Sequence, residues 1–397
     1  MKSLLAPGLL LLLLFSTGLT AHEDHTKHQK SSLAVSTTFD QQGRLWRAWV
    51  RGGQVLVDHS VDQAATFSAA VAINPQAEKI GADGELRPKI ALGQQGEIYV
   101  TWTQALDKPY SGDIKFSRSI DGGLHFSAPI VINHNRDIIT HRFDSLAIAA
   151  DGTIYVAWID KRDLHTAQAL GKKYTGAAVY YAVSKDHGVS FSAEYKVADS
   201  SCECCRIALK PAPDGSATMF WRHVYGQNTR DHAIAGISAN GVTHAPTRVS
   251  YDNWKIDACP HHGPAMARGS NWGWHLAWYN GSEEKQGLMY ARMDGTAWVT
   301  SPPRAFGNSA AQASHPDLWS AGERVFLVWK ELTENAAIVM LMTSDDGGRN
   351  WGAPRQIAQT TGAADNPFLL ANGEHVYLSW NTTTDGYRLI ALPEQAK

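Results

Sequence analysis

Cysteine is scarce in this sequence, and its few copies are unevenly placed. The 397 residues include four cysteines. Cys202, Cys204 and Cys205 stand together in the stretch SCECCR, and Cys259 opens the stretch CPHHGP. Four cysteines allow three pairings into two disulfides, so a framework of many disulfides is excluded. The crowding therefore needs a local explanation, either a disulfide or a chemical site.

An excess of charge is also absent. The formal net charge is -2 and the calculated pI is about 6.8. A protein that binds nucleic acid or an acidic lipid surface usually carries a marked positive balance. We therefore expect no nucleic acid among the partners.

Long apolar runs are missing beyond the N-terminus. Residues 1–21 contain one early lysine, a run of leucines and a small-residue end, which is typical of a signal peptide cleaved after Ala21. The run is too short for a comfortable membrane span, and no later segment is long and apolar enough for one. We expect a periplasmic or secreted protein that is a monomer, with no membrane span in the mature chain.

Helical periodicity is not convincing anywhere in the mature chain, but a short apolar strand that contains tryptophan recurs along it. The aligned tryptophans are Trp49, Trp102, Trp158, Trp221, Trp278, Trp329 and Trp380. Each copy belongs to a unit of four short strands separated by turn signals, which is the pattern of a propeller blade. The sequence predicts an all-β fold, a β-propeller of four-stranded blades over residues 33–397, with seven blades favoured and six as the alternative. The last unit lacks a clear fourth strand, which a strand from the N-terminal part could supply.

A second motif recurs between the third and fourth strands of a unit. It reads SIDGGLHF, SKDHGVSF and SDDGGRNW, with a weaker copy SVDQAATF. It resembles the Asp-box, or BNR, repeat of the sialidase superfamily, and the resemblance covers nearly the whole mature chain. The resemblance implies a propeller fold and a structural role for the box aspartates Asp62, Asp121, Asp186 and Asp346, away from the ligand face. Asp followed by Gly turns the chain, and the carboxylate can accept hydrogen bonds from that turn.

Ligands of propellers bind at one mouth of the central channel, near the loops that lead into the innermost strands. The cysteine cluster, CPHH and other polar segments occupy equivalent loops in successive units, so we expect them to converge. The candidate metal ligands are Cys202, Cys204, Cys205, Cys259, His261, His262, His141 and His315. Asp317 is a candidate for orienting a histidine from outside the ligand set.

Thiolate and imidazole groups suit soft transition metals, so copper is favoured and zinc is the alternative. Read as a strand, the cluster would point Cys202 and Cys204 one way and Cys205 the other, so that at most two could share a site unless a bulge re-aims one. Disulfides are the structural alternative, because exported proteins tend to pair their cysteines.

The expected N-terminus of the mature protein offers a second metal signal. His22, His25 and His28 lie in a polar stretch, residues 22–32, that we expect to be a flexible tail. Short histidine-rich tracts of this kind often bind metal.

The family resemblance also raises the question of sialidase activity. Sialidases hold the sugar carboxylate with three arginines and use a tyrosine with a glutamate partner and an aspartic acid. Here Arg87, Arg142 and Arg206 are candidates for the arginines, and Asp317 for the acid. Asp144 and Tyr387 are weaker guesses, and no tyrosine and glutamate pair can be identified.

Three functions therefore remain open. The favoured one is an exported propeller that binds a soft metal ion, which includes a copper-dependent redox enzyme. The second is an exo-α-sialidase or a related glycoside hydrolase with a carbohydrate ligand. The third is a non-catalytic scaffold for a periplasmic partner protein.

Overall fold

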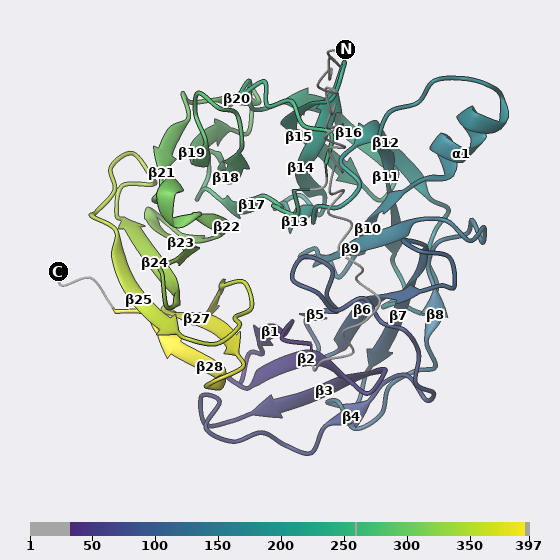
Figure 1. Cartoon of the computed structure of the whole chain (residues 1–397). Helices are drawn as coiled ribbons and strands as arrows, with labels where there is room; N and C mark the ends of the chain where they lie inside the picture. The colour runs from purple at the N-terminus through teal and green to yellow at the C-terminus, as the bar shows by residue number, and fades with distance from the viewer. Residues whose placement is uncertain (1–31, 259, 394–397) are drawn as a thin grey trace, which may run out of the picture. The chain divides into compact units, whose positions relative to one another are not determined.

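The computed structural model describes residues 32–258 and 260–393. They belong to one compact unit, Ser31–Lys397, whose secondary structure consists almost entirely of antiparallel strands. Successive groups of strands form sheets that are arranged around a common centre (Figure 1). This arrangement confirms the predicted all-β propeller.

The first strand of each group lies nearest the centre. These strands are β1 (Ser36–Phe39), β5 (Lys89–Leu92), β9 (His141–Ile148), β13 (Ala208–Pro211), β17 (Ala265–Arg268), β22 (Ser314–Ala321) and β26 (Phe368–Asn372). Each contacts the next one in this order, and β26 contacts β1. The loops that precede them therefore meet around one axis, as the sequence predicted.

The second strands carry the recurring tryptophans. They are β2 (Leu45–Arg51), β6 (Ile98–Ala105), β10 (Ile154–Asp160), β14 (Ala217–Tyr225), β18 (Gly273–Asn280), β23 (Arg324–Leu332) and β27 (His375–Thr382). Every one of these tryptophans except Trp49 is at most 1% exposed. Their rings fill the layers between neighbouring sheets, which is why the pattern recurs once per unit.

Most of these indoles also donate a hydrogen bond. Trp158 donates to Asp160, Trp278 to Asp252 and Trp329 to Glu331, at 2.7 to 2.9 Å. Trp221 differs, because its buried indole nitrogen has no partner among the described residues. The unit that departs from the repeat is the one that contains the cysteine cluster.

The third strands are β3 (Gln54–Ser60), β7 (Gly112–Ser119), β11 (Ala177–Ser184), β15 (Thr229–Ser238), β19 (Gly287–Asp294), β24 (Ala337–Ser344) and β28 (Gly386–Ala391). Four of the seven, β3, β7, β11 and β24, end at the predicted box turns. In the turn after β24, the Asp346 carboxylate accepts hydrogen bonds from Ser344 and from the backbone N–H groups of Arg349 and Asn350. The box aspartates thus stabilise turns, which is the structural role expected of them.

The outer strands are more variable. They are β4 (Val71–Ala72), β8 (Ile130–Val131), β12 (Tyr195–Ser201), β16 (Gly241–Arg248), β20 (Val299–Thr300), β21 (Arg304–Phe306) and β25 (Arg355–Thr360). A single pair, Ser201 with His223, joins two groups into an eight-stranded sheet. The last group, β26 to β28, has three strands. Because of these two irregularities, the number of blades stays a prediction.

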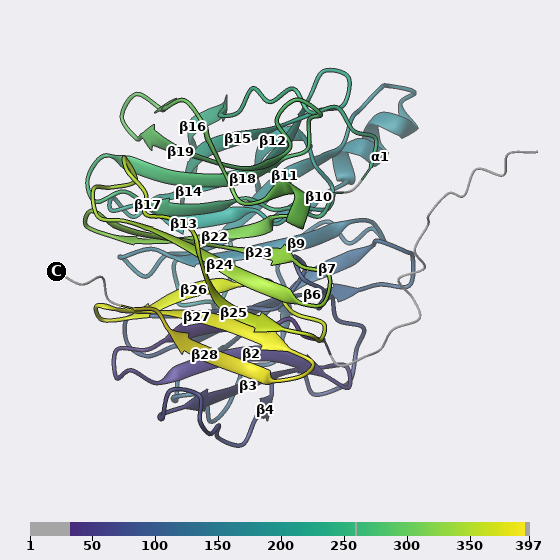
Figure 2. The ribbon, with the colours of Figure 1, turned by 60° about the vertical axis from the view of Figure 1, so that its left-hand side comes forward.

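The two ends of the strand sequence meet without exchanging a strand. Within residues 32–258 and 260–393, β1 pairs with β2, and no strand is added to β28. Figure 2 shows β26, β27 and β28 side by side. The first and last groups are joined by side chains instead. Asn381 donates to the Leu33 carbonyl oxygen at 3.0 Å, and Thr37 donates to the Ser379 hydroxyl at 3.1 Å.

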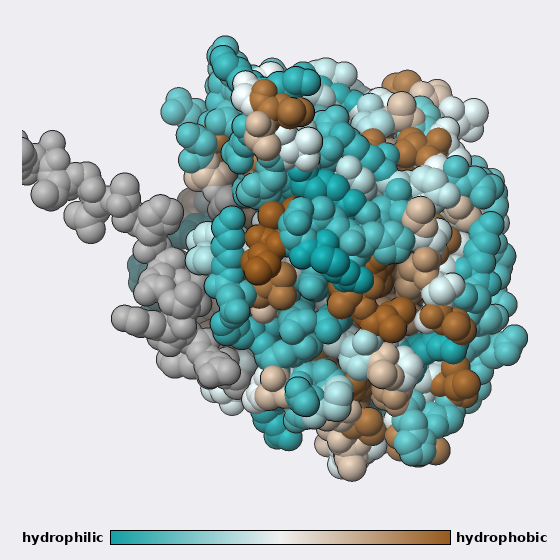
Figure 3. All heavy atoms as spheres, turned by 90° about the vertical axis from the view of Figure 1, so that its right-hand side faces the viewer, coloured by the Kyte–Doolittle hydropathy of each residue, from teal (hydrophilic) through white to brown (hydrophobic). Residues whose placement is uncertain are grey.

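Among the described residues, one α-helix and a short 3-10 helix, Ser309–Ala311, interrupt the strands, although the sequence showed no convincing helical period. Helix α1 (Arg162–Ala169) lies in the long connection between β10 and β11 and buries none of its residues. It contributes nothing to the core, and this explains why its apolar pattern is weak. No helix in the described ranges is long and apolar enough to cross a membrane. On the face shown in Figure 3, hydrophobic and hydrophilic residues are interspersed.

Candidate functional site

The cysteine segment is a turn and not a strand. Residues 202–205 follow the end of β12 and precede β13 without forming a strand of their own. The expectation that Cys205 points away from the other two is therefore wrong, because strand alternation does not apply within a turn. All three side chains converge.

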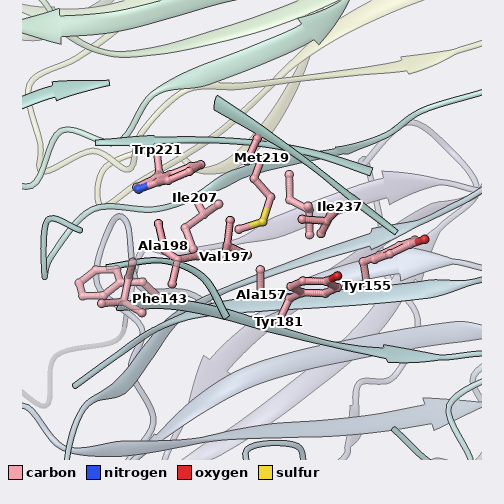
Figure 4. Packing of buried hydrophobic residues seen from close by; sticks show 14 of the residues in the cluster. Phe143, Tyr155, Ala157, Tyr181, Val197, Ala198, Ile207, Met219, Trp221 and Ile237 are labelled. Atoms are coloured by element: carbon pink, nitrogen blue, oxygen red, sulfur yellow. The ribbon is translucent and has the colours of Figure 1, made fainter. Parts of the chain in front are cut away.

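The three sulfurs form a compact buried group, which we call the thiol cluster (Cys202, Cys204, Cys205). The Cys202 Sγ lies 3.8 Å from the Cys204 Sγ and 3.6 Å from the Cys205 Sγ. All three sulfurs lie within 4.8 Å of one another, and no disulfide joins them to each other. The residues are 1%, 5% and 2% exposed and belong to the hydrophobic cluster that includes Trp221 and Ile207. Figure 4 shows Trp221, Ile207 and Met219 of this cluster lying close together.

The cluster is polarised by its own hydrogen bonds and by an arginine. Bonds from Cys204 and Cys205 lower the pKa of Cys202 well below that of an ordinary thiol. The bond to Cys202 raises the pKa of Cys205. The Arg222 guanidinium donates through Nη1 to the Cys205 Sγ at 3.3 Å. A cation beside thiols favours the thiolate, which is the form that binds metal.

A second polar group lies where the beginnings of four innermost strands meet, and we call it the mouth group (Glu85, Arg206, His262, His315). Glu85 lies 3.1 Å from His315 Nδ1 and 3.5 Å from Arg206 Nη1. The Arg206 guanidinium also donates to the Pro264 and Pro316 carbonyl oxygens. Burial opposes ionisation of Glu85, but Arg206 and His315 outweigh it and lower its pKa.

His262 completes the mouth group. Its ring stacks on Tyr279 at 4.1 Å, lies 5.0 Å from the His315 ring, and has a buried Nδ1 with no partner in the described structure. Burial lowers the pKa of His262 to about 3, so the imidazole is neutral at neutral pH. Neutral imidazole is the form that binds a metal.

Other predicted ligands are placed apart or are not described. His141 is fully buried on β9 and lies 2.9 Å from the Gly112 carbonyl oxygen. His261 is exposed and adopts a positive φ of 50°. Within the described residues, no histidine joins the three cysteines in a group whose ligand atoms all lie within 4.8 Å. Cys259 and the tail histidines His22, His25 and His28 lie outside the described residues.

The arginines proposed for a sugar carboxylate are already engaged. Arg87 is 3% exposed and forms a two-bond ion pair with Asp365, at 2.5 and 2.8 Å. Arg206 belongs to the mouth group, and the Arg142 Cζ lies 5.7 Å from the Tyr110 ring centroid. The Asp317 carboxylate accepts the Leu369 N–H at 2.8 Å, so Glu85, and not Asp317, bonds to His315.

Asp144 and Tyr387, the weaker candidates for sialidase residues, also make structural contacts. Asp144 is 1% exposed and accepts hydrogen bonds from the Thr101 and Thr103 hydroxyls. Tyr387 packs edge to face on Phe67, with ring centroids 5.9 Å apart.

Two residues that belong to these sites, Arg222 and Glu85, were not predicted from the sequence. Arg222 follows Trp221 on β14, and Glu85 stands two residues before Arg87. A charged residue directly after the repeat tryptophan was an available signal at Arg222. Glu85 gave no such signal, because its partners come from loops more than a hundred residues away.

No family model and no curated protein sequence matches the chain. Solved structures do match it. A polysaccharide lyase, the PL25 ulvan lyase bound to GlcA(1-4)Rha3S, aligns at 11% identity over 92% of this chain and 96% of its own, with a TM-score of 0.53. The polysaccharide lyase Uly1 aligns at 9% identity over 91% and 89%, with a TM-score of 0.53. The NanB sialidase from Streptococcus pneumoniae aligns at 8% identity over 81% and 68%, with a TM-score of 0.49.

Likeness at these identities concerns the fold alone. Together with the strand arrangement, the likeness to the two lyases supports the expected propeller fold.

Proposed function

We propose that this chain is an exported sialidase-like propeller that binds one soft transition metal ion in the thiol cluster, copper as Cu(I) before zinc. The observation that carries the proposal is the convergence of three buried sulfurs from one turn. Soft thiolate ligands select Cu(I) and zinc over the hard cations magnesium and calcium.

The spacing of the sulfurs supports this assignment. A metal–thiolate bond of about 2.3 Å places two sulfur ligands about 3.8 Å apart in tetrahedral and about 4.0 Å apart in trigonal geometry. The two separations from the Cys202 Sγ, 3.8 Å to the Cys204 Sγ and 3.6 Å to the Cys205 Sγ, are close to these values. An ion could therefore be bound with only small movements of the side chains.

The remaining candidate ligands keep a place in the proposal. Cys259 and His261 stand three residues and one residue before His262, a member of the mouth group, and stay predicted ligands that the three-sulfur site does not require. We propose that His141 is structural, because it is fully buried and lies 3.7 Å from Asp160 through Nε2.

The test is metal binding by protein purified without a histidine tag and reduced under nitrogen. Competition with a chromogenic Cu(I) chelator should give one tight site per chain in the wild type. Cys202→Ser and Cys205→Ser should weaken it on the order of 100-fold or more, because each removes a thiolate ligand. His125→Ala, on an 86% exposed side chain, is the matched control and should bind like the wild type. A wild type without a tight site would refute the proposal.

A carbohydrate-handling enzyme is the second candidate, favoured by the fold likeness to polysaccharide lyases. The engagement of Arg87 by Asp365 counts against a sialidase-type carboxylate site. Turnover of a fluorogenic sialoside or of a uronate-containing polysaccharide would support this candidate. If the protein neither binds metal nor turns over these substrates, the scaffold function remains. A pull-down of partner proteins would test it.

A further inference from the structure

Arg222 is an unusually placed cation. It is 1% exposed, on β14 between two neighbouring groups of strands. Its Nη1 donates to the Cys205 Sγ at 3.3 Å, its Nη2 donates to the Tyr279 carbonyl oxygen at 3.1 Å, and its Cζ lies 5.0 Å from the Trp254 ring centroid. The guanidinium is therefore held from several sides and directed at a sulfur.

The described residues provide no carboxylate within ion-pair distance of Arg222. Its Nε is also buried without a partner in this part of the chain. A buried charge is costly unless an opposite charge lies close to it. The thiol cluster is the adjacent group that can supply negative charge, since three thiols become three thiolates when a metal binds.

Charge decides which ion gains most from this arrangement. Three thiolates around a monovalent ion leave a net charge of about -2, and around a divalent ion about -1. With the positive charge of Arg222 included, the net charge becomes about -1 for the monovalent ion and about zero for the divalent ion. Because the cost of burying a charge rises steeply with its size, removing the arginine penalises the monovalent complex more than the divalent one.

We propose that Arg222 is the specificity-determining residue of the thiol cluster, and that its fixed positive charge allows a buried three-sulfur site to accept monovalent Cu(I). This inference rests on the proposed metal-binding function. The ligands that the structure describes agree with it. In the described chain, no further Cys, His, Asp or Glu ligand atom lies within 4.8 Å of all three sulfurs. Structural zinc sites almost always take four ligands.

The test compares Cu(I) and Zn(II) affinity in full-length wild type, Arg222→Met and Arg222→Lys, each by competition with a chromogenic chelator. Arg222→Met should weaken Cu(I) binding on the order of 100-fold and Zn(II) binding far less. Arg222→Lys keeps the charge and should retain most of the preference for Cu(I). Arg292→Met is the matched control, because the Arg292 Cζ lies 4.1 Å from the Trp272 ring centroid in a similar stack without a cysteine.

The thiolate-to-copper absorption band gives a readout that general loss of stability would not move. The band should shift in Arg222→Met and keep its wild-type position in Arg292→Met. Equal losses of Cu(I) and Zn(II) affinity, or none, would overturn the inference. If Arg222→Met does not fold, loss of the Cu(I) preference in folded Arg222→Lys would overturn it as well. A wild type that binds neither ion would refute the proposed function itself, so the two failures are distinguishable.

Discussion

The residues of this chain show most directly which charges are structural and which are available for chemistry. Arg87 and Asp365 illustrate the first kind, because both are nearly inaccessible and satisfy each other. Arg222 and the thiol cluster illustrate the second kind, because their pairing is incomplete until the thiols ionise. Sequence alone could not separate the two arginines, since the partner of Arg87 lies 278 positions away.

The first prediction concerns this buried pair. Arg87→Met should destabilise the fold by about 3 to 5 kcal/mol, because it leaves the Asp365 carboxylate buried without its partner. The double variant Arg87→Met with Asp365→Leu should recover much of the loss. Denaturant unfolding measures both.

The exposed pair of Arg349 and Glu323 provides the control. Its side chains are 55% and 49% exposed, so Arg349→Met should cost less than about 1 kcal/mol. A folded Arg87→Met protein of wild-type stability would show that Arg87 is not structural and would reopen its assignment to a carboxylate ligand.

The strands and turns were the part of the structure that the sequence predicted best. The tryptophan strands and the box turns recur in sequence because each unit repeats the same packing and the same turn chemistry. The cysteine turn was predicted poorly for the opposite reason. It occurs once, and nothing in its spacing distinguishes a strand from a turn that brings three sulfurs together.

The second prediction uses the exception among the tryptophans. Trp329→Phe removes an indole donor that lies 2.7 Å from Glu331, whereas Trp221→Phe removes a buried donor with no partner in the described chain. The lost ring area is the same in both. The first variant should therefore lose about 1 to 2 kcal/mol more in the free energy of unfolding. Equal losses in thermal or denaturant unfolding would show that these indole bonds contribute nothing.

The third prediction concerns pH and the box turns. The Asn350 backbone N–H, with further hydrogen bonds, lowers the pKa of Asp346 from 3.8 to about 2. A carboxyl group whose pKa is lower in the folded state stabilises the fold above its unfolded pKa. That contribution is lost as the pH falls through the folded value.

The stability difference between the wild type and Asp346→Asn should therefore shrink as the pH falls from about 4 to about 2. Asp107→Asn, on a 99% exposed side chain, is the control. A difference that is constant over this range would contradict the assigned role of the turn.

On the scale of the whole molecule, the repeat predicted the fold and the meeting of the innermost loops. It did not predict how the ends close. The first and last groups meet through side chains such as Asn381 and Thr37, and such contacts leave no periodic signal in the sequence. Nor could it show that the cysteines and the mouth histidines form two groups. That division depends on the path of each loop after it reaches the centre.

We propose that one soft metal ion is bound by the three sulfurs of Cys202, Cys204 and Cys205. Copper X-ray absorption on the wild type loaded with one equivalent of Cu(I) tests it most directly, because it counts the ligands by element. We expect a coordination shell of three sulfur atoms around the copper, with fewer sulfur atoms in Cys205→Ser. A shell of nitrogen and oxygen atoms, unchanged in that variant, would contradict it.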